Sequence, residues 1–178
     1  IIEINKDNYK EYIPSLIRVI RGAFIAVAES HNIKHDDQPN FAAFMQENTL
    51  IGKVKAGVFY VGYMYEGEII ACLGVEDNRN GVFSLLNLAV LPKYQGNGLG
   101  RALVKRAEKN IWVDRGIKIK IGLIEEDHFR FEWYKSLGYN FKTKKKFGKG
   151  KRGVVFMEKK HFSKKITKSQ SQCPNCGM

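Results

Sequence analysis

The sequence predicts one α/β domain with a mixed, mostly antiparallel sheet of about six or seven strands and helices on both faces. Its length of 178 residues, 44% of them hydrophobic, suffices for one sizeable core and favours one domain over two. Runs rich in aromatic and β-branched residues alternate with runs of helical periodicity. The turn signals Glu66-Gly67 and Asn80-Gly81 join successive strand-like runs, so neighbouring strands are expected to be antiparallel.

The chain is expected to begin with a short strand at residues 1–4, followed by an amphipathic helix. Pro14 is interpreted as opening this helix, because the fixed φ of proline suits a first helical turn. Apolar residues then recur near a period of 3.6 at Leu16, Ile20, Phe24 and Val27. A second, short helix is predicted before Gly52, which separates it from the next strand-like run. It carries Phe41, Phe44 and Met45.

The middle of the chain predicts three strands and the longest of the later helices. Residues 58–65 and 68–76 form a hairpin around the first turn signal. Residues 82–90 are nearly all apolar, which is expected of a central strand covered on both faces. A helix begins near Leu99 and ends at Gly116. Its apolar side carries Leu99, Leu103, Ala107 and Ile111.

The C-terminal part is expected to complete the sheet. Isoleucines alternate with lysines over residues 117–121, as in a half-exposed strand. A short helix over residues 128–137 ends at Gly138, the usual position for a glycine that stops a helix. Two last strands, residues 139–147 and 154–158, are joined by a turn rich in glycine and lysine.

The positive charge is concentrated near the C-terminus. Residues 161–178 are polar and basic, so we expect a domain of residues 1–160 and a mobile tail. Of the net charge of +12, a surplus of +11 lies between Lys142 and Lys168, where twelve Lys or Arg accompany the single acidic residue Glu158. Such a cluster can steer a polyanion, including cofactor phosphates. Nucleic acid is not the expected partner, because no stacking platform or recognition helix accompanies the lysines.

Neither a membrane location nor a metal site is expected. No run approaches the roughly 20 apolar residues of a membrane span, and the first residues lack the apolar core of a signal peptide, so we expect a cytoplasmic protein. Cys173 and Cys176 resemble half of a zinc knuckle, but two thiolates cannot complete a tetrahedral site even if His161 joins them. His31 and His35 are one helical turn apart, and no further ligand lies near them apart from two aspartates.

A glycine-rich loop follows the apolar strand of residues 82–90. Gly96, Gly98 and Gly100 lead directly into the next helix, whose first N–H groups have no intrahelical partner and favour an anion such as a phosphate. The spacing is not the G-x-G-x-x-G of a dinucleotide-binding unit, and the loop does not follow the first strand of a βαβ repeat. Arg101 stands where a Walker loop would require lysine.

Two sequence blocks resemble one family. Residues 88–100 read Leu-Ala-Val-Leu-Pro-x-Tyr-Gln-Gly-x-Gly-x-Gly and resemble the acetyl-CoA-binding motif Q/R-x-x-G-x-G/A of the GNAT superfamily of N-acetyltransferases. One strand later, Glu132-x-Tyr134-x-x-Leu137-Gly138-Tyr139 is similar to the Y-x-x-x-G-F/Y signature that closes the family's domain. With the order of elements, the resemblance covers about residues 1–160.

The resemblance implies acetyl-CoA as co-substrate and a sheet that is splayed between its fourth and fifth strands. It implies direct transfer of an acetyl group, within a ternary complex, to a primary amine of a small molecule or protein, and it leaves a homodimer open. The pantetheine arm would pair with the backbone of Leu88, Ala89 and Val90. The pyrophosphate would lie against the amides of Gln95, Gly96, Asn97, Gly98, Leu99, Gly100 and Arg101.

Tyr134 matches the family tyrosine that donates a proton or hydrogen bond to the coenzyme A sulfur. It lies about 100° around its helix from the expected apolar face of Phe129, Trp133 and Leu137, so it need not be buried with them. A base is harder to identify, since Asn87 stands where some members carry glutamate. Glu76 and Glu125 are the leading candidates, with solvated or capping roles as the alternative. Asp77, Glu126 and Asp127 are further candidates.

Three departures from the family pattern stand out. Asp127 occupies the place of a common asparagine, and Arg130 that of a small residue. Gly122 aligns with a glutamate found in members that acetylate ribosomal-protein N-termini, which weakens that choice of substrate. The alternative function is a non-catalytic module that senses acyl-CoA or binds nucleic acid through its basic C-terminal region.

Overall fold

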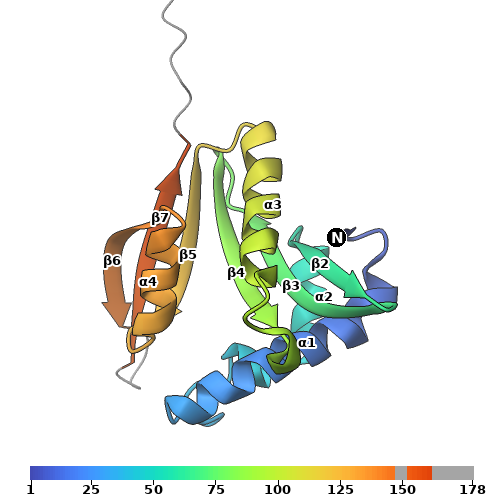
Figure 1. The fold of residues 1–178 in the computed structure, drawn as a ribbon, viewed down its shortest axis with the longest axis horizontal. Coiled ribbons are helices and arrows are strands. Elements are labelled where there is room, and N and C mark those ends of the chain that lie inside the picture. Colours follow the sequence, from blue (N-terminus) through green and yellow to red (C-terminus); the bar gives the residue numbers. More distant parts are fainter. Residues whose placement is uncertain (147–151, 162–178) are drawn as a thin grey trace, which may run out of the picture.

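Figure 1 shows the computed structural model, which describes residues 1–146 and 152–161. The helices and strands, in chain order, are β1 (Ile2–Ile4), α1 (Tyr9–Ser30), η1 (Ala42–Phe44), α2 (Glu47–Lys55), β2 (Phe59–Tyr65), β3 (Glu68–Asp77), β4 (Val82–Val90), η2 (Pro92–Tyr94), α3 (Leu99–Val113), β5 (Lys118–Ile124), α4 (His128–Ser136), β6 (Asn140–Lys146) and β7 (Gly153–Lys160). The predicted mixed α/β fold is confirmed. The predicted tail lies almost wholly outside the described residues.

The strands form one seven-stranded sheet in the order β1-β2-β3-β4-β5-β7-β6. All neighbours are antiparallel except β4 and β5, which are parallel and pair only where Val82–Ser84 meet Lys118–Lys120. Beyond these residues the two strands diverge, as Figure 1 shows, and the predicted splay between the fourth and fifth strands is confirmed. A parallel pair this short leaves most of the facing edges of β4 and β5 without ladder hydrogen bonds.

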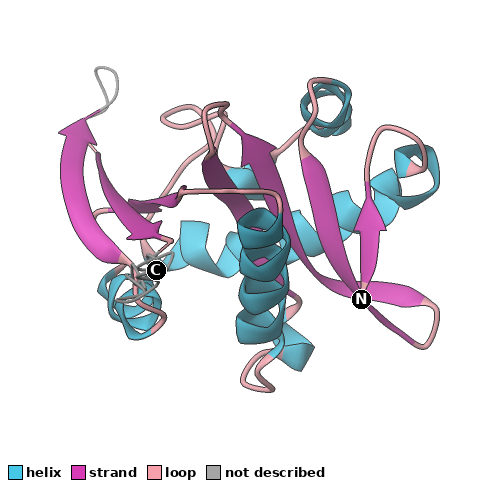
Figure 2. Ribbon diagram, turned by 90° about the horizontal axis from the view of Figure 1, so that it is seen from above, coloured by secondary structure: helices cyan, strands magenta, loops and turns pink. Residues whose placement is uncertain are grey.

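Two apolar layers cover the two faces of the sheet, and the alternation of side chains along each strand decides which layer a residue joins. On β3, Cys72 packs in the layer with α1 and α2, whereas its neighbour Leu73 packs in the layer with α3 and α4. The α3 layer extends over β5 and β7, while the α1 layer covers the strands from β1 to β4. Figure 2 shows helices on both faces of the sheet.

The N-terminal helices depart from the prediction. Helix α1 begins at Tyr9 and contains Pro14 in its interior, so proline does not open it. The missing N–H falls near the start of the helix, and burial of Ile13 and Leu16 outweighs its loss. Likewise, Gly52 does not separate a helix from the strands but lies inside α2, where burial of Leu50 and Val54 offsets the helix-weakening effect of glycine.

Two predictions about burial were wrong. Strand β4 is not covered on both faces: only Leu85 and Ala89 are buried, because its neighbour β5 diverges and leaves the other side chains half-exposed. On α4, Phe129 is 81% exposed, whereas Tyr134 is the buried residue, 5% exposed. The first turn of α4 borders the pocket and leaves Phe129 uncovered, so the apolar periodicity of this short helix does not identify its buried side.

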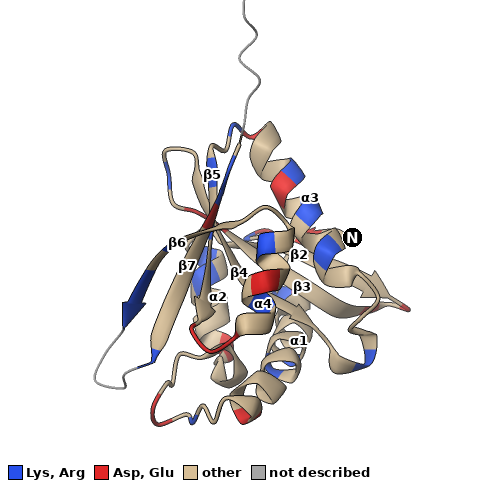
Figure 3. Ribbon diagram, turned by 60° about the vertical axis from the view of Figure 1, so that its left-hand side comes forward, with Lys and Arg blue, Asp and Glu red and all other residues tan. Residues whose placement is uncertain are grey.

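Four of the twelve basic residues of the cluster lie on an edge strand. Strand β6 lies at the margin of the sheet and carries Lys142, Lys144, Lys145 and Lys146 (Figure 3). Lysines on an edge strand hinder the addition of a strand from another chain. Cys173 and Cys176 lie outside the described residues. Among the helices within the described ranges, none is long and apolar enough to cross a membrane.

Candidate active site

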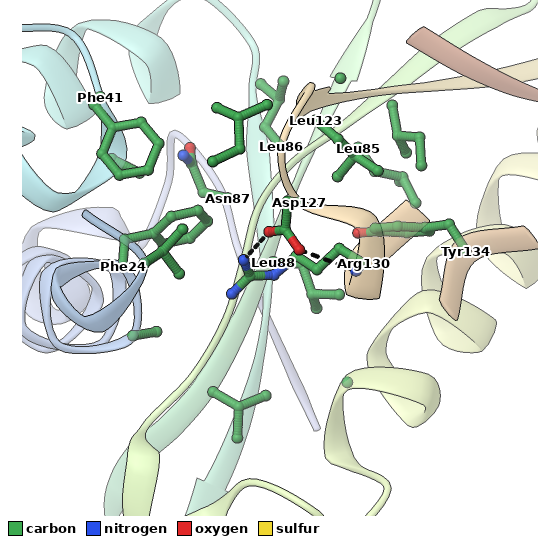
Figure 4. Close-up of a pocket in the computed structure, with 18 of the residues that line it drawn as sticks. Phe24, Phe41, Leu85, Leu86, Asn87, Leu88, Leu123, Asp127, Arg130 and Tyr134 are labelled. Atoms are coloured by element: carbon green, nitrogen blue, oxygen red, sulfur yellow. Dashed lines mark hydrogen bonds and ion pairs between the residues drawn. The ribbon is translucent and has the colours of Figure 1, made fainter. Parts of the chain in front are cut away.

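The divergence of β4 and β5 opens a pocket of about 1110 Å³ that passes through the sheet. We call its two ends the glycine-loop side and the α1 side. The glycine-loop side is lined by Leu88, Val90, Gln95, Gly96, Gly98, Leu99, Gly100, Arg101 and Trp133. The α1 side is lined by Phe24, Phe41, Lys53, Asn87, Lys120 and Arg152. Figure 4 shows the centre of the pocket, where both ends meet.

A β-bulge bends β4 at the pocket. Cys72 pairs with Ala89 and Gly74 with Leu86, so Asn87 and Leu88 lie opposite the single residue Leu73. Asn87 adopts a left-handed φ of 50°, which asparagine tolerates better than most residues. The bulge interrupts the ladder where the opposite edge of β4 has also lost β5. An asparagine within an apolar strand was the only sequence signal for it.

The bulge is supported from behind by a buried tyrosine. The Tyr60 hydroxyl donates a hydrogen bond to Asn87 Oδ1 at 3.2 Å. The ring of Tyr60 lies so close to Gly74 that a Cβ there would approach it to 2.9 Å, which explains the glycine. Because Tyr60 holds the amide oxygen, the Nδ2 group of Asn87 is left to donate elsewhere, and the side chain lines the pocket.

The glycine loop leaves the start of α3 open. Gly96 and Gly98 have φ values of 81° and 76°, which favour glycine, and Gly98 is the N-cap of α3 without a side-chain cap. No atom lies within 4 Å of the Cβ position of either glycine, so the surface beside them is free of protein. Gly98, Leu99 and Gly100 line the pocket, so the first turn of α3, where N–H groups lack intrahelical partners, borders it.

The polar residues of the loop hold its shape. The N–H of Gln95 donates to Pro92 O at 3.2 Å, so it is already used, and Gln95 Nε2 donates to Val90 O at 2.9 Å. Asn97 Nδ2 donates to Tyr94 O at 3.2 Å, and Asn97 does not line the pocket. Of the predicted strand residues, Leu88 and Val90 line the pocket, whereas Ala89 is buried in the α1 layer.

Tyr134 lies at the centre of the pocket with its hydroxyl directed inward (Figure 4). Its ring packs edge-to-face against Trp133 at 4.8 Å and Tyr139 at 5.5 Å between centroids. Burial raises the pKa of Tyr134, with a further increase from the Asp127 carboxylate and an opposing effect from Arg130. The hydroxyl is therefore protonated at neutral pH, and it makes no hydrogen bond to any other described residue.

Asp127 and Arg130, the two residues at the start of α4 that depart from the family pattern, contact one another. Asp127 Oδ1 accepts a hydrogen bond from the N–H of Arg130 at 3.0 Å and caps the helix, and Oδ2 pairs with Arg130 Nη1. The guanidinium of Arg130 lies 5.7 Å over the ring of Phe24. Arg130 therefore connects α4 to α1 across the gap between the strands, a role that its sequence position alone could not reveal.

Of the five carboxylates predicted as bases, all but Asp127 lie outside the pocket lining. Glu76 is half-buried at the end of β3, opposite Ser84. Glu125 forms an ion pair with Lys144 and packs against Gly153. Glu126 pairs with Arg152 at 3.3 Å, and Asp77 accepts a hydrogen bond from a backbone N–H nearby. Among the described residues, the carboxylates on the pocket wall are Asp37 and Asp127.

The α1 side is aromatic and basic. Phe24 and Phe41 pack edge-to-face with ring centroids 5.8 Å apart. Arg152 Nη2 donates to His31 O at 2.9 Å and joins β7 to the end of α1. Sequence reasoning did not identify these residues, because they come from segments far apart in the chain. Within the described ranges, no group of three or more His, Cys, Asp or Glu residues is placed to hold a metal ion.

The sequence and the fold were compared with known proteins. Residues 55–141 match the family described as the acetyltransferase (GNAT) domain. No curated protein sequence matches the chain. The fold resembles PaiA N-acetyltransferase from Thermoplasma acidophilum in complex with coenzyme A, with a TM-score of 0.70 at 16% identity over 85% of this chain and 94% of that one.

Two further solved structures share the fold. The ribosomal-protein-S18-alanine N-acetyltransferase from Escherichia coli has a TM-score of 0.65 at 19% identity, over 82% of this chain and 85% of that one. A GNAT family acetyltransferase from Staphylococcus aureus has a TM-score of 0.66 at 18% identity, over 89% of this chain and 96% of that one. At these identities the likeness concerns the fold.

Proposed function

Because the chain belongs to the GNAT acetyltransferase superfamily, we propose that it transfers an acetyl group from acetyl-CoA to a primary amine by direct attack in a ternary complex. One observation carries this proposal. The unpaired edge of β4 runs along the pocket and continues into a glycine loop that exposes the start of α3. A long, phosphate-bearing thioester fits such a path, since its amides need backbone partners and its phosphates need N–H donors.

In this proposal the donor lies on the glycine-loop side. The N–H groups at the start of α3 and the side chain of Arg101 bind the pyrophosphate. The backbone of Leu88 and Val90, on the edge that β5 has left, binds the pantetheine amides. Gln95 and Asn97 contribute by holding the loop rather than by contacting phosphate.

The reaction then needs a neutral amine, a stabilised oxyanion and a stabilised leaving group. The amine nitrogen attacks the thioester carbonyl, the C–N bond forms, the C–S bond breaks, the amine loses a proton and the thiolate gains one. Backbone N–H groups of the bulged part of β4 meet the oxyanion. Tyr134 donates a hydrogen bond to the departing thiolate, because burial raises its pKa and keeps the hydroxyl protonated.

Direct attack is preferred over an acetylated enzyme. Cys72 is fully buried, burial raises the pKa of its thiol, and it does not line the pocket. A thiol that stays protonated and enclosed is a poor nucleophile. It is the one cysteine among the described residues, so that part of the chain provides no thiol for a covalent intermediate.

The non-catalytic alternative is less well supported. A module that only senses acyl-CoA would not require a protonated tyrosine directed into the gap. A nucleic-acid module would use the lysines of β6, which is separated from the pocket by β7 and β5 in the order of the sheet. Neither Glu76 nor Glu125 enters the proposal as a direct base, because neither lines the pocket.

The test is release of free thiol from acetyl-CoA in the presence of alkyl and aromatic amines, with the acetylated amine identified by mass. We expect thiol release that depends on the amine and matches the amount of product. Thiol release that is equal with and without amine, with no acetylated product, would reject transfer and leave a binding or hydrolytic role.

A further inference from the structure

The α1 side of the pocket has no buried carboxylate that is free to act as a base. Both oxygens of Asp127 are occupied by Arg130, and Asp37 lies exposed on the loop after α1. None of the four histidines lines the pocket. Residues 147–151 and 162–178, which are not described, contain no Asp, Glu or His. The described wall therefore offers no buried, unpaired side-chain base to deprotonate an incoming ammonium group, and its one unpaired carboxylate, Asp37, is exposed to solvent.

The same wall is basic. Lys53, Lys120, Arg130 and Arg152 line this side of the pocket against two aspartates. Arg130 and Arg152 have acidic partners, but Lys53 and Lys120 form no ion pair with other described residues. On β5, Ile119 and Ile121 pack in the α3 layer, so Lys120 projects to the α1 side. Positive charge there disfavours a bound ammonium group and attracts an acid.

Aromatic rings form the rest of this side. The edge-to-face pair of Phe24 and Phe41 lies beside Asn87, and Figure 4 shows these three side chains around one end of the pocket. The amide Nδ2 of Asn87 is left to donate, since Tyr60 binds the oxygen. Planar rings and one fixed donor suit a flat, polar-tipped molecule better than a flexible aliphatic chain.

From these three features we infer that the acceptor is a weakly basic aromatic amine that carries an acidic group, of the aminobenzoate type. The inference rests on the proposed function and names the substrate class of the same site. An aromatic amine is unprotonated at neutral pH, so it needs no base before attack. An alkylamine resembling lysine is about one part in 2,500 neutral at pH 7, and the enzyme would have to deprotonate it.

In the transfer, the aromatic nitrogen forms the new C–N bond with the acetyl carbon while the C–S bond breaks. The nitrogen loses its proton to solvent after attack, and the coenzyme thiolate takes up a proton. Lys120 binds the carboxylate of the acceptor, and the ring packs against the pair formed by Phe24 and Phe41. Lys120 is thus a specificity-determining residue rather than a participant in bond making.

The test compares two matched acceptors, 4-aminobenzoate and 4-(aminomethyl)benzoate, which share the ring and the acid and differ in amine basicity. We expect kcat/KM for 4-aminobenzoate to be constant from about pH 6 to 9. For 4-(aminomethyl)benzoate, kcat/KM should rise about tenfold per pH unit, in proportion to the fraction of its amine that is neutral. We also expect kcat/KM for 4-aminobenzoate to exceed that for spermidine by about 100-fold, because the basic wall repels a polycation.

The role of the carboxylate of the acceptor is tested with the variant Lys120→Met. This variant should lower kcat/KM for 4-aminobenzoate about tenfold more than for aniline, which lacks the carboxylate. Lys10→Met is the matched control, because Lys10 is an exposed residue of α1 that does not line the pocket. It should leave both acceptors unaffected.

Several results would overturn the inference. One is a plateau in kcat/KM for 4-(aminomethyl)benzoate well below the pKa of its own amine, which would reveal an enzyme base. Others are better turnover of spermidine or of a short peptide with a free α-amino group, or transfer to none of these amines while acetyl-CoA still binds. Failure of acetyl-CoA to stabilise the protein would instead reject the proposed function, and the inference with it.

Discussion

The two sides of the pocket are built in different ways. The glycine-loop side comes mainly from one continuous segment, from the bulge in β4 to the first turn of α3, and it presents mostly backbone groups. The α1 side is assembled from side chains of α1, the loop after it, α2, β5 and the start of β7. A backbone site depends on glycine and on local geometry, whereas a side-chain site can change its ligand by substitution. The first side therefore indicates the family, and in our proposal the second side selects the acceptor.

The largest expected effect is at the glycine-loop side. Gly98→Glu places a side chain on a residue with a φ of 76° and brings a negative charge to the start of α3. We expect the affinity for acetyl-CoA to fall by at least about 100-fold in titration calorimetry.

Gly67→Glu is the matched control for this variant. Gly67 also has a positive φ, 81°, with no atom within 4 Å of its Cβ position, but it lies in the turn between β2 and β3. The backbone strain is similar and Gly67 does not line the pocket, so the affinity for acetyl-CoA should be unchanged. Equal affinity of both variants and the wild type would show that the glycine loop does not bind the phosphates.

The next largest effect concerns the centre of the pocket, where the two sides meet. Tyr134→Phe removes the hydroxyl but keeps the ring against Trp133 and Tyr139. We expect kcat to fall by about 100-fold while the Kd of acetyl-CoA is unchanged, since the hydrogen bond is made to the leaving thiolate. Tyr65→Phe, at the half-exposed end of β2, is the control. An unaltered kcat in Tyr134→Phe would remove the tyrosine from the mechanism.

A smaller effect is expected on the contact that keeps the two halves of the sheet in place. Lys159 Nζ on β7 donates to both oxygens of the buried Glu108 on α3, at 2.8 and 2.9 Å. Lys159→Ala leaves that carboxylate unpaired and should lower the free energy of unfolding by about 2 kcal/mol, a value reduced for the partial exposure of the lysine.

Lys160→Ala is its control, because Lys160 is 62% exposed and lies 4.0 Å from its acidic partner. It should change the free energy of unfolding by less than about 0.5 kcal/mol in urea denaturation. If Lys159→Ala were equally mild, the ion pair of Lys159 and Glu108 would contribute little to holding the two halves of the sheet together.

The smallest expected effect concerns the pH dependence of kcat, whose decline at alkaline pH should be shifted to higher pH. The proposed mechanism needs protonated Tyr134, and burial raises the pKa of its hydroxyl above the ordinary 10.0. The protonated form therefore persists beyond the pH at which an exposed tyrosine would ionise. With an aromatic amine acceptor, kcat should stay level from pH 7 to about 10. A decline in kcat centred below pH 10 would indicate that another group titrates in the reaction.

What the sequence predicted well was local. The turn at Glu66-Gly67, the start of α3 near Leu99 and the limits of β4 follow from turn residues, glycines and apolar runs, whose effects act within a few residues. The open glycine loop belongs to the same class. Its conformation depends on Gly96 and Gly98 themselves, not on distant neighbours.

The sequence could not predict the features that depend on tertiary packing. Pro14 and Gly52 lie inside helices because burial of their neighbours outweighs local preference. The burial of Tyr134 depends on where α4 meets the sheet, and the pairing of Asp127 with Arg130 matters only because Phe24 lies across the gap. None of these relations has a spacing that a reader of the sequence could use.

The most direct measurement is thermal unfolding of the wild-type protein with and without acetyl-CoA. At 100 times the Kd, binding to the folded state adds about 2.7 kcal/mol, which should raise the Tm by roughly 5–10 °C for a chain of this size. A saturable rise of this kind is the predicted result. An unchanged Tm at millimolar acetyl-CoA would contradict a donor site in the gap between β4 and β5.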